Sequence, residues 1–97
     1  MATGLGTAII DFGSGAGTAE ASVTVAGQTS ISATSKAEAY VMGDDTSSNH
    51  TALDHRWIGS FMNLTCGTPT AGAGFTIYAT CIDTMTGQFT IRWIWAD

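Results

Sequence analysis

Two histidines and three acids gather in one short polar stretch, which holds the residue types best suited to chemistry. The stretch covers positions 44–56 and contains His50, Asp54 and His55. Two imidazoles and a carboxylate could supply three ligands to a metal ion. Alternatively, one imidazole could act as a general base while Asp54 orients it. The stretch is therefore a candidate for a metal-binding or acid–base site.

The spacing of these residues favours a structural role instead. The histidines of a helical zinc motif are four positions apart and these are five apart, while a cupin-like site needs ligands from several strands. None of the many serines lies in a strained nucleophile elbow. Asp, Asn and Ser can cap a short helical turn around positions 51–54, with Arg56 beside the acids. We expect no catalytic residue and no cofactor, and keep His50, Asp54 and His55 only as weak metal-ligand candidates.

The two histidines could also stabilise a structural loop. An imidazole donates and accepts hydrogen bonds at the same time, so it can tie a long loop to backbone groups. Its charge changes between pH 5 and 8, so acidification could loosen the loop or an interface.

Alternation of apolar and polar residues defines the elements that must position this stretch. The alternation is clearest at positions 19–25, 36–41, 75–82 and 88–95. A period of two is typical of strands with one face on a core, and no segment has the apolar spacing of a long amphipathic helix. The sequence predicts one domain over residues 1–97, an all-β, antiparallel, jelly-roll-like β-sandwich of six to eight short strands.

Turn residues divide the predicted strands. Glycine-rich or Gly-Asp segments separate the strands at positions 13–17, 43–45 and 67–74. Two more strands are expected at 7–12 and 57–65. The short link at 83–87 joins two strongly alternating runs, which predicts a β-hairpin between 75–82 and 88–95.

The last segment of the chain is its most apolar part and offers both a core strand and an interface. Ile91, Trp93 and Trp95 fall on one face of the predicted strand, which suits the centre of a core. A second interpretation places Ile94, Trp95 and Tyr78 in an exterior patch that meets another subunit, since Tyr and Trp are favoured at interfaces. The full set of interface candidates is Tyr40, Trp57, Tyr78, Ile94 and Trp95.

Charge and composition limit the partners of the chain. Its 97 residues include 3 Lys and Arg against 8 Asp and Glu, and the formal net charge is −5. Nucleic acid and anionic membrane surfaces are excluded as partners, because phosphate binding needs clustered cations. Charged residues make up only 11% of the chain, which predicts a surface buried against another protein. The sequence begins without a basic, apolar leader, so we expect a product of the cytoplasm.

The cysteine content gives one further expectation. Cys66 and Cys81 are too few for a disulfide framework. The favoured interpretation is two reduced thiols in the core, and a bridge would require that the strand ends carrying them are neighbours.

The order of several segments is similar to that of a known family. The segments are Ile-Asp-Phe-Gly at 10–13, Ala-Ser-Val-Thr-Val-Ala-Gly-Gln at 21–28, Ser-Lys-Ala-Glu-Ala-Tyr-Val at 35–41, Asn-His-Thr-Ala-Leu-Asp-His at 49–55, Gly-Ala-Gly-Phe-Thr-Ile-Tyr-Ala at 72–79 and Gly-Gln-Phe-Thr-Ile-Arg-Trp-Ile-Trp at 87–95. Over nearly the whole chain they resemble small virion structural proteins of tailed bacteriophages, which include cement (decoration) proteins. No catalytic residues come with this resemblance.

The resemblance implies a non-enzymatic virion protein that is made in the host cytoplasm. The most direct expectation is a capsid cement protein that binds and stabilises the assembled shell of the major capsid protein. Its partners would be the major capsid protein or another virion protein, with self-association as a dimer or trimer. Two alternatives stay open: a tail or fibre domain that binds a receptor carbohydrate through Tyr40, Trp57 and Tyr78, and a small metal-dependent, cupin-like enzyme.

Overall fold

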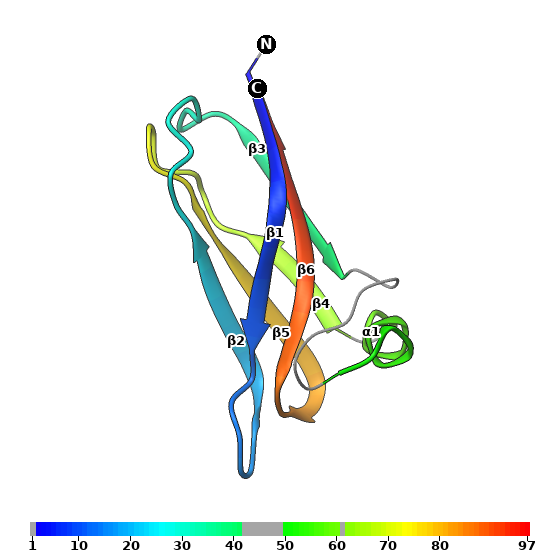
Figure 1. The fold of residues 1–97 in the computed structure, drawn as a ribbon. Coiled ribbons are helices and arrows are strands. Elements are labelled where there is room, and N and C mark those ends of the chain that lie inside the picture. The colour runs from blue at the N-terminus through cyan, green and yellow to red at the C-terminus, as the bar shows by residue number, and fades with distance from the viewer. Residues whose placement is uncertain (1, 42–49, 61) are drawn as a thin grey trace.

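Six strands and one short helix make up the part of the chain that the computed structural model describes, residues 2–41, 50–60 and 62–97. The elements are β1 (Thr3–Asp11), β2 (Thr18–Val25), β3 (Lys36–Val41), α1 (Ala52–Ile58), β4 (Met62–Cys66), β5 (Phe75–Met85) and β6 (Gln88–Ala96). The two ends of the chain lie side by side, since the backbone N–H of Asp97 donates to the carbonyl of Ala2 at 3.1 Å (Figure 1).

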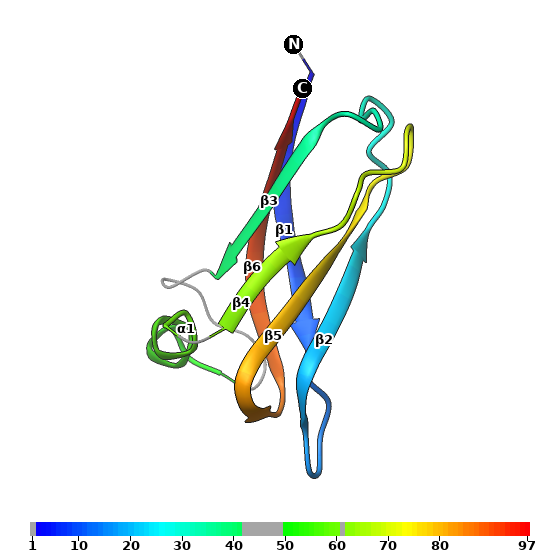
Figure 2. The ribbon, with the colours of Figure 1, turned by 180° about the vertical axis from the view of Figure 1, so that it is seen from behind.

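The strands form two antiparallel sheets that pack face to face. Sheet A has the order β1–β6–β3, and sheet B has the order β2–β5–β4. Figures 1 and 2 show the two layers from opposite sides, with α1 beside the start of β4. Among the described strands, every connection except the β4–β5 loop passes from one sheet to the other. The predicted antiparallel β-sandwich is confirmed, with six strands in the described part of the chain.

The facing sides of the two sheets form the core, and β6 at the centre of sheet A contributes its largest side chains. Trp93 is 6% exposed and packs edge-on against Phe75 of sheet B, with ring centroids 5.7 Å apart. Gly6 on β1 pairs with Trp93, and a Cβ at this position would overlap the indole ring. The glycine therefore provides the space that the tryptophan fills.

The predicted hairpin between residues 75–82 and 88–95 is wrong. β5 belongs to sheet B and β6 to sheet A, so the short link at residues 86–87 carries the chain across the core. Gly87 in this link has a left-handed φ of 85°, and its N–H donates to the carbonyl of Gly13 in the β1–β2 connection. Alternation could not reveal the crossing, because paired strands and strands that face each other across a core both bury every second residue.

The predicted strand at 57–65 is wrong in its first part. Trp57 lies on α1, and β4 begins only after that helix has ended. A cap formed by Thr51 and Asp54 starts the helix and overrides the preference of Trp57 for a strand.

The other strand boundaries agree better with the predictions. β1 begins at Thr3, earlier than the expected position 7, because glycines in its first half weaken the strand signal. The glycine-rich loop at 67–74 separates β4 from β5 as predicted. The predicted strand end at 43–45 lies outside the described residues. In the described part of the chain, no helix is long and apolar enough to cross a membrane.

Candidate functional site

Helix α1 carries several of the predicted site residues and begins at a capping box. The hydroxyl of Thr51 accepts from the N–H of Asp54 (3.3 Å), and the Asp54 carboxylate accepts from the N–H of Thr51 (3.1 Å). These bonds satisfy donors that the first turn of a helix leaves without partners. The helix ends at Gly59, whose N–H reaches the carbonyl of His55 at 3.1 Å. The predicted capped helical turn is present, but its N-cap is Thr51 and not the Asp, Asn or Ser that the sequence suggested.

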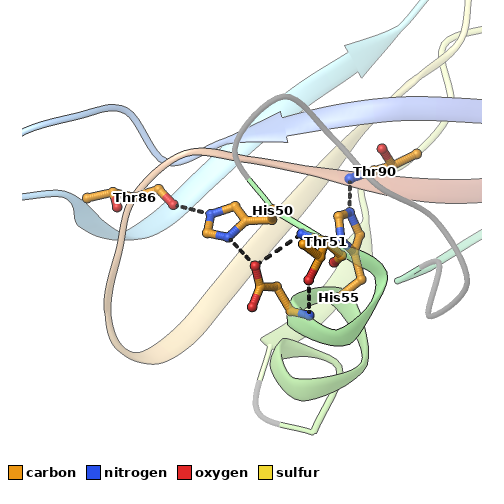
Figure 3. Close-up of polar contacts among 6 residues, drawn as sticks. His50, Thr51, His55, Thr86 and Thr90 are labelled. Atoms are coloured by element: carbon orange, nitrogen blue, oxygen red, sulfur yellow. Dashed lines mark hydrogen bonds and ion pairs between the residues drawn. The ribbon is translucent and has the colours of Figure 1, made fainter.

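His55 is completely buried, and backbone groups occupy both of its ring nitrogens. Its exposed fraction is 0%. Nε2 lies 2.9 Å from the backbone nitrogen of Thr90, which is a donor, so Nε2 is the unprotonated acceptor. Nδ1 therefore carries the proton and donates to the carbonyl of Thr51 at 2.7 Å (Figure 3). The imidazole is neutral in this arrangement.

The end of a neighbouring strand explains why a polar ring is buried at this position. β3 pairs with β6 as far as Val41 opposite Ile91, so Thr90 lies just past the end of β3. The ring nitrogen of His55 takes the hydrogen bond that a strand carbonyl would otherwise accept. Phe89 packs edge-on against the same imidazole, with centroids 5.3 Å apart. His55 thus joins the helix to the sheet.

His50 joins the segment before α1 to the link between β5 and β6. Its ring stacks on Phe89 with centroids 4.0 Å apart and an interplanar angle of 12°. Nε2 lies 2.8 Å from the carbonyl oxygen of Thr86, and Nδ1 lies 3.3 Å from Oδ2 of Asp54 (Figure 3). Both partners are acceptors, so both contacts are hydrogen bonds only when the imidazole carries two protons.

The carboxylate of Asp54 is held in its ionised form by these neighbours. The hydrogen bond from the backbone N–H of Thr51 lowers the pKa of Asp54 below its ordinary value of 3.8, desolvation opposes the decrease, and His50 adds to it. A negative charge in the first turn also suits the dipole of the helix. Asp54 therefore serves as a charged cap at neutral pH.

These contacts decide what the histidine cluster can do chemically. A metal ligand needs a free nitrogen lone pair, and His55 has none because Nε2 accepts from Thr90 and Nδ1 is protonated. Among the described residues, no three His, Cys, Asp or Glu side chains converge as metal ligands. The trio of His50, Asp54 and His55 therefore does not form a three-ligand site. The prediction that the histidines tie the loop to backbone groups is confirmed.

A polar hollow of about 510 Å³ lies beside His50. The residues that line it are Asp11, Gly13, Ser14, Gly15, His50, Thr86, Gly87 and Gln88. The carboxylate of Asp11 accepts from the N–H of Gly13 (2.7 Å) and from the amide of Gln88 (3.3 Å). The carboxylate of Asp11 and Nε2 of His50 are thus both engaged in hydrogen bonds within the fold.

The two cysteines lie on adjacent strands but far apart along them. Both thiols are free. Cys66 pairs with Ile77 and Cys81 with Met62, so about 13 Å of strand separates them, beyond the reach of a disulfide. Burial raises the pKa of both thiols above 9.0, and Glu38 adds to the increase at Cys66. Both thiols are therefore protonated and weakly nucleophilic near neutral pH.

The five interface candidates do not share one surface, and one of them is buried. Tyr40 and Ile94 lie on the outer face of sheet A, Tyr78 on the outer face of sheet B, and Trp57 on α1; these four are exposed. Trp95 is only 2% exposed, which contradicts its assignment to an exterior patch. The alternation along β6 turns Trp95 into the core and Ile94 outward.

In residues 2–41, 50–60 and 62–97, four more large apolar side chains are exposed that the sequence analysis did not single out: Leu5, Ile9, Leu53 and Ile82. Leu53 and Trp57 are four positions apart on α1 and share its outer face. Trp57 and Ile82 line one groove of about 320 Å³. We call Leu53, Trp57 and Ile82 the helix patch. The sequence pattern could have indicated that Ile82 is exposed. Ile82 is four positions after Tyr78 on β5, so both side chains point to the same, exposed side of the strand.

Known proteins supply no relative from which a function could be transferred to these contacts and surfaces. No family model, curated protein or solved structure matches this chain.

Proposed function

We propose that this chain is a non-enzymatic structural protein of a virion, and specifically a capsid cement protein that binds the assembled shell of the major capsid protein. The observation that carries the proposal is the helix patch. Trp57 is 59% exposed, Leu53 67% and Ile82 86%, on a small protein with a well-packed core. Large apolar side chains that gather on a surface indicate an interface, and tryptophan is the residue most enriched among binding hot spots.

Other features support a structural role over an enzymatic one. The histidine cluster, whose residue types are best suited to catalysis or metal binding, instead attaches α1 and the segment before it to the sheets. It does so through the hydrogen bonds of His50 and His55. The low content of charged residues, 11%, suits a protein that is covered by a partner. The resemblance of the sequence to small phage virion proteins points to the same class of function.

The physical action of a cement protein follows from linkage. A chain that binds only the assembled shell adds its binding free energy to the stability of that shell. Burial of the helix patch supplies on the order of 2–4 kcal/mol of hydrophobic free energy for each copy. Symmetry repeats this contact over the shell, so that many weak contacts act together.

Calorimetry of shells tests this proposal directly. Shells of the major capsid protein from the same virus are melted with and without the purified chain, and the wild-type chain is expected to raise their melting temperature. Trp57→Ala and Ile82→Ser are expected to weaken binding to the shell at least tenfold. Tyr78→Ala is the matched control, because it removes an exposed aromatic ring outside the helix patch. Shells whose melting temperature does not change at saturating concentrations of the chain would contradict the proposal.

A receptor-binding tail or fibre domain is the second candidate, and one observation favours it. Tyr78 borders a groove of about 220 Å³ together with Thr24 and Thr76, whose hydroxyls are 3.2 Å apart. An aromatic ring beside hydroxyl groups suits the face and edge of a sugar. Tyr40 and Trp57 lie on other surfaces, so the three aromatic candidates do not form one platform. A glycan-array signal that is lost in Tyr78→Ala and kept in Trp57→Ala would favour this candidate over cement.

A further inference from the structure

The sandwich has exposed edges at its outer strands, and most of them are protected against pairing with another chain. β3 carries Lys36 and Glu38 at exposed positions. β2 has an irregular register between Thr18 and Glu20, and β4 is only five residues long. Charged side chains, bulges and short strands are the devices that keep an edge from acting as a template for a further strand.

β1 has none of these devices. It is nine residues long and pairs with β6 over its full length without a register shift. It contains no proline, and its only charged residue is Asp11 at its last position. β1 is therefore the edge that the sequence leaves open to another strand.

The backbone groups on the outer edge of β1 can be assigned from its two ends. On the β6 side, the carbonyl of Ala2 accepts from Asp97, and the N–H of Phe12 donates to Gly87. Because backbone groups alternate along a strand, the even-numbered residues face β6 and the odd-numbered residues point their N–H and C=O groups away from the sheet. The odd-numbered residues are Thr3, Leu5, Thr7, Ile9 and Asp11. Among the described strands, β6 is the only one that pairs with β1.

We infer that a second copy of this chain pairs with the edge of β1, antiparallel, with Thr7 opposite Thr7 of the partner copy. The result is a continuous sheet of six strands in which the two β1 strands are central. The inference deepens the proposed function, because it rests on the self-association expected of a cement protein and names the surface responsible for it. A two-fold axis through Thr7 gives full overlap of the nine-residue strand, since Thr7 is its middle residue.

The side chains of β1 are complementary to themselves in this register. Leu5 lies opposite Ile9 of the second copy, and Thr3 lies opposite Asp11 of that copy. Leu5 is 71% exposed and already pairs with the outward Ile94 of its own chain, so the second copy extends a row of apolar side chains. No like charges face each other. The two Asp11 carboxylates are about 27 Å apart, which is well beyond the screening length in physiological salt.

The expected affinity is modest. Full overlap allows about ten backbone hydrogen bonds between the two strands. One pair of edge strands buries less surface than the roughly 1,200 Å² of a stable interface, so the dissociation constant is expected on the order of micromolar. Copies fixed side by side on a shell would pair more readily, because attachment raises their effective concentration.

Sedimentation velocity over a concentration series tests the inference with the purified chain alone. The wild-type chain is expected to change from monomer to dimer as its concentration passes through the micromolar range. Thr7→Lys is expected to weaken the dimer at least tenfold, since two lysines would face each other across the axis beside Arg92 of each chain. Ser22→Lys is the matched control: it adds the same charge at an exposed position of β2 and should leave the dimer unchanged. Melting temperatures show that each variant is folded.

A mixing experiment tests the register. Leu5→Lys and Ile9→Glu are each expected to weaken the homodimer. Their equimolar mixture is expected to form a heterodimer, because the introduced lysine of one chain then faces the introduced glutamate of the other. A wild-type chain that stays monomeric at millimolar concentration, a Thr7→Lys variant that dimerises as the wild type does, or a mixture without heterodimer would each overturn the inference. These outcomes do not involve the shell, so failure here is distinguishable from failure of shell binding through the helix patch.

Discussion

Helix α1 buries a polar residue on its inner face and exposes two large apolar residues on its outer face. The inner face carries His55, a polar residue with no exposed surface, beside the equally buried Ile58. The outer face carries Leu53 and Trp57, which are large, apolar and more than half exposed. An amphipathic helix would normally have its apolar residues inside and its polar residues outside.

Residue type alone therefore does not locate function in this protein. The imidazole of His55 is buried because the N–H of Thr90 lies just past the end of β3. That N–H needs a hydrogen-bond acceptor, and the ring nitrogen of His55 supplies it. Trp57 lies on the other face and is 59% exposed. The inner face therefore has a structural explanation, and the outer face is the one that we propose as a contact surface.

The largest effect on stability is expected from loss of the polar atoms on the inner face. His55→Phe keeps an aromatic ring against Phe89 but removes the imidazole acceptor of the Thr90 N–H and the imidazole donor to the Thr51 carbonyl, which still accepts from the backbone N–H of residue 55. The free energy of unfolding should fall by about 2–4 kcal/mol, as measured by urea denaturation. If the variant is as stable as the wild type, the hydrogen bonds of His55 do not hold the helix to the sheet.

A smaller loss is expected from the cap at the start of the helix. Thr51→Ala removes the hydroxyl that accepts from the N–H of Asp54 and should lower the free energy of unfolding by about 1 kcal/mol. Thr51→Ser keeps the hydroxyl and should retain most of the stability. Equal losses in both variants would show that the methyl group, and not the cap, is responsible.

The dependence of stability on pH gives a further test of the cap. The pKa of Asp54 is lower in the folded protein than its ordinary value of 3.8, so the ionised carboxylate stabilises the fold above that value. The contribution is lost as the pH falls through the lowered pKa. The difference in melting temperature between the wild type and Asp54→Asn should therefore shrink on going from about pH 5 to about pH 2. A constant difference over this range would mean that the charge of Asp54 plays no part.

The smallest effect on stability is expected on the outer face. Trp57→Ala should change the free energy of unfolding by less than about 1 kcal/mol, because the side chain is mostly exposed. The same substitution is expected to have the largest effect on binding to the shell. A loss of stability as large as that of His55→Phe would make Trp57 a structural residue and remove the contrast between the two faces.

Much of the fold could be predicted from alternation, while the connections could not. Period-two patterns located β2, β3, β5 and β6, and they placed Trp93 in the core. The pattern reports which residues are buried and not which sheet a strand joins, so the crossing at Gly87 was mistaken for a hairpin. Trp95 was assigned to a surface as well as to the core, although its phase along β6 allowed only the core.

The candidate site was less predictable, because the role of each histidine depends on hydrogen bonds to residues that are distant in the sequence. The pairing of His55 with Thr90 joins residues 35 positions apart, and sequence spacing gives no sign of it. The helix patch was missed in part because Leu53 and Ile82 are ordinary core residues by type. The exposure of Leu53 is visible only in the folded chain, whereas that of Ile82 agrees with its phase along β5.

A cryo-electron reconstruction of the virus particle that contains this chain tests the central claim most directly. We expect copies of the chain on the assembled shell, with Leu53, Trp57 and Ile82 against the major capsid protein and the buried ring of His55 away from the contact. Copies absent from the shell, or seated with the outer face of α1 in solvent, would contradict the claim.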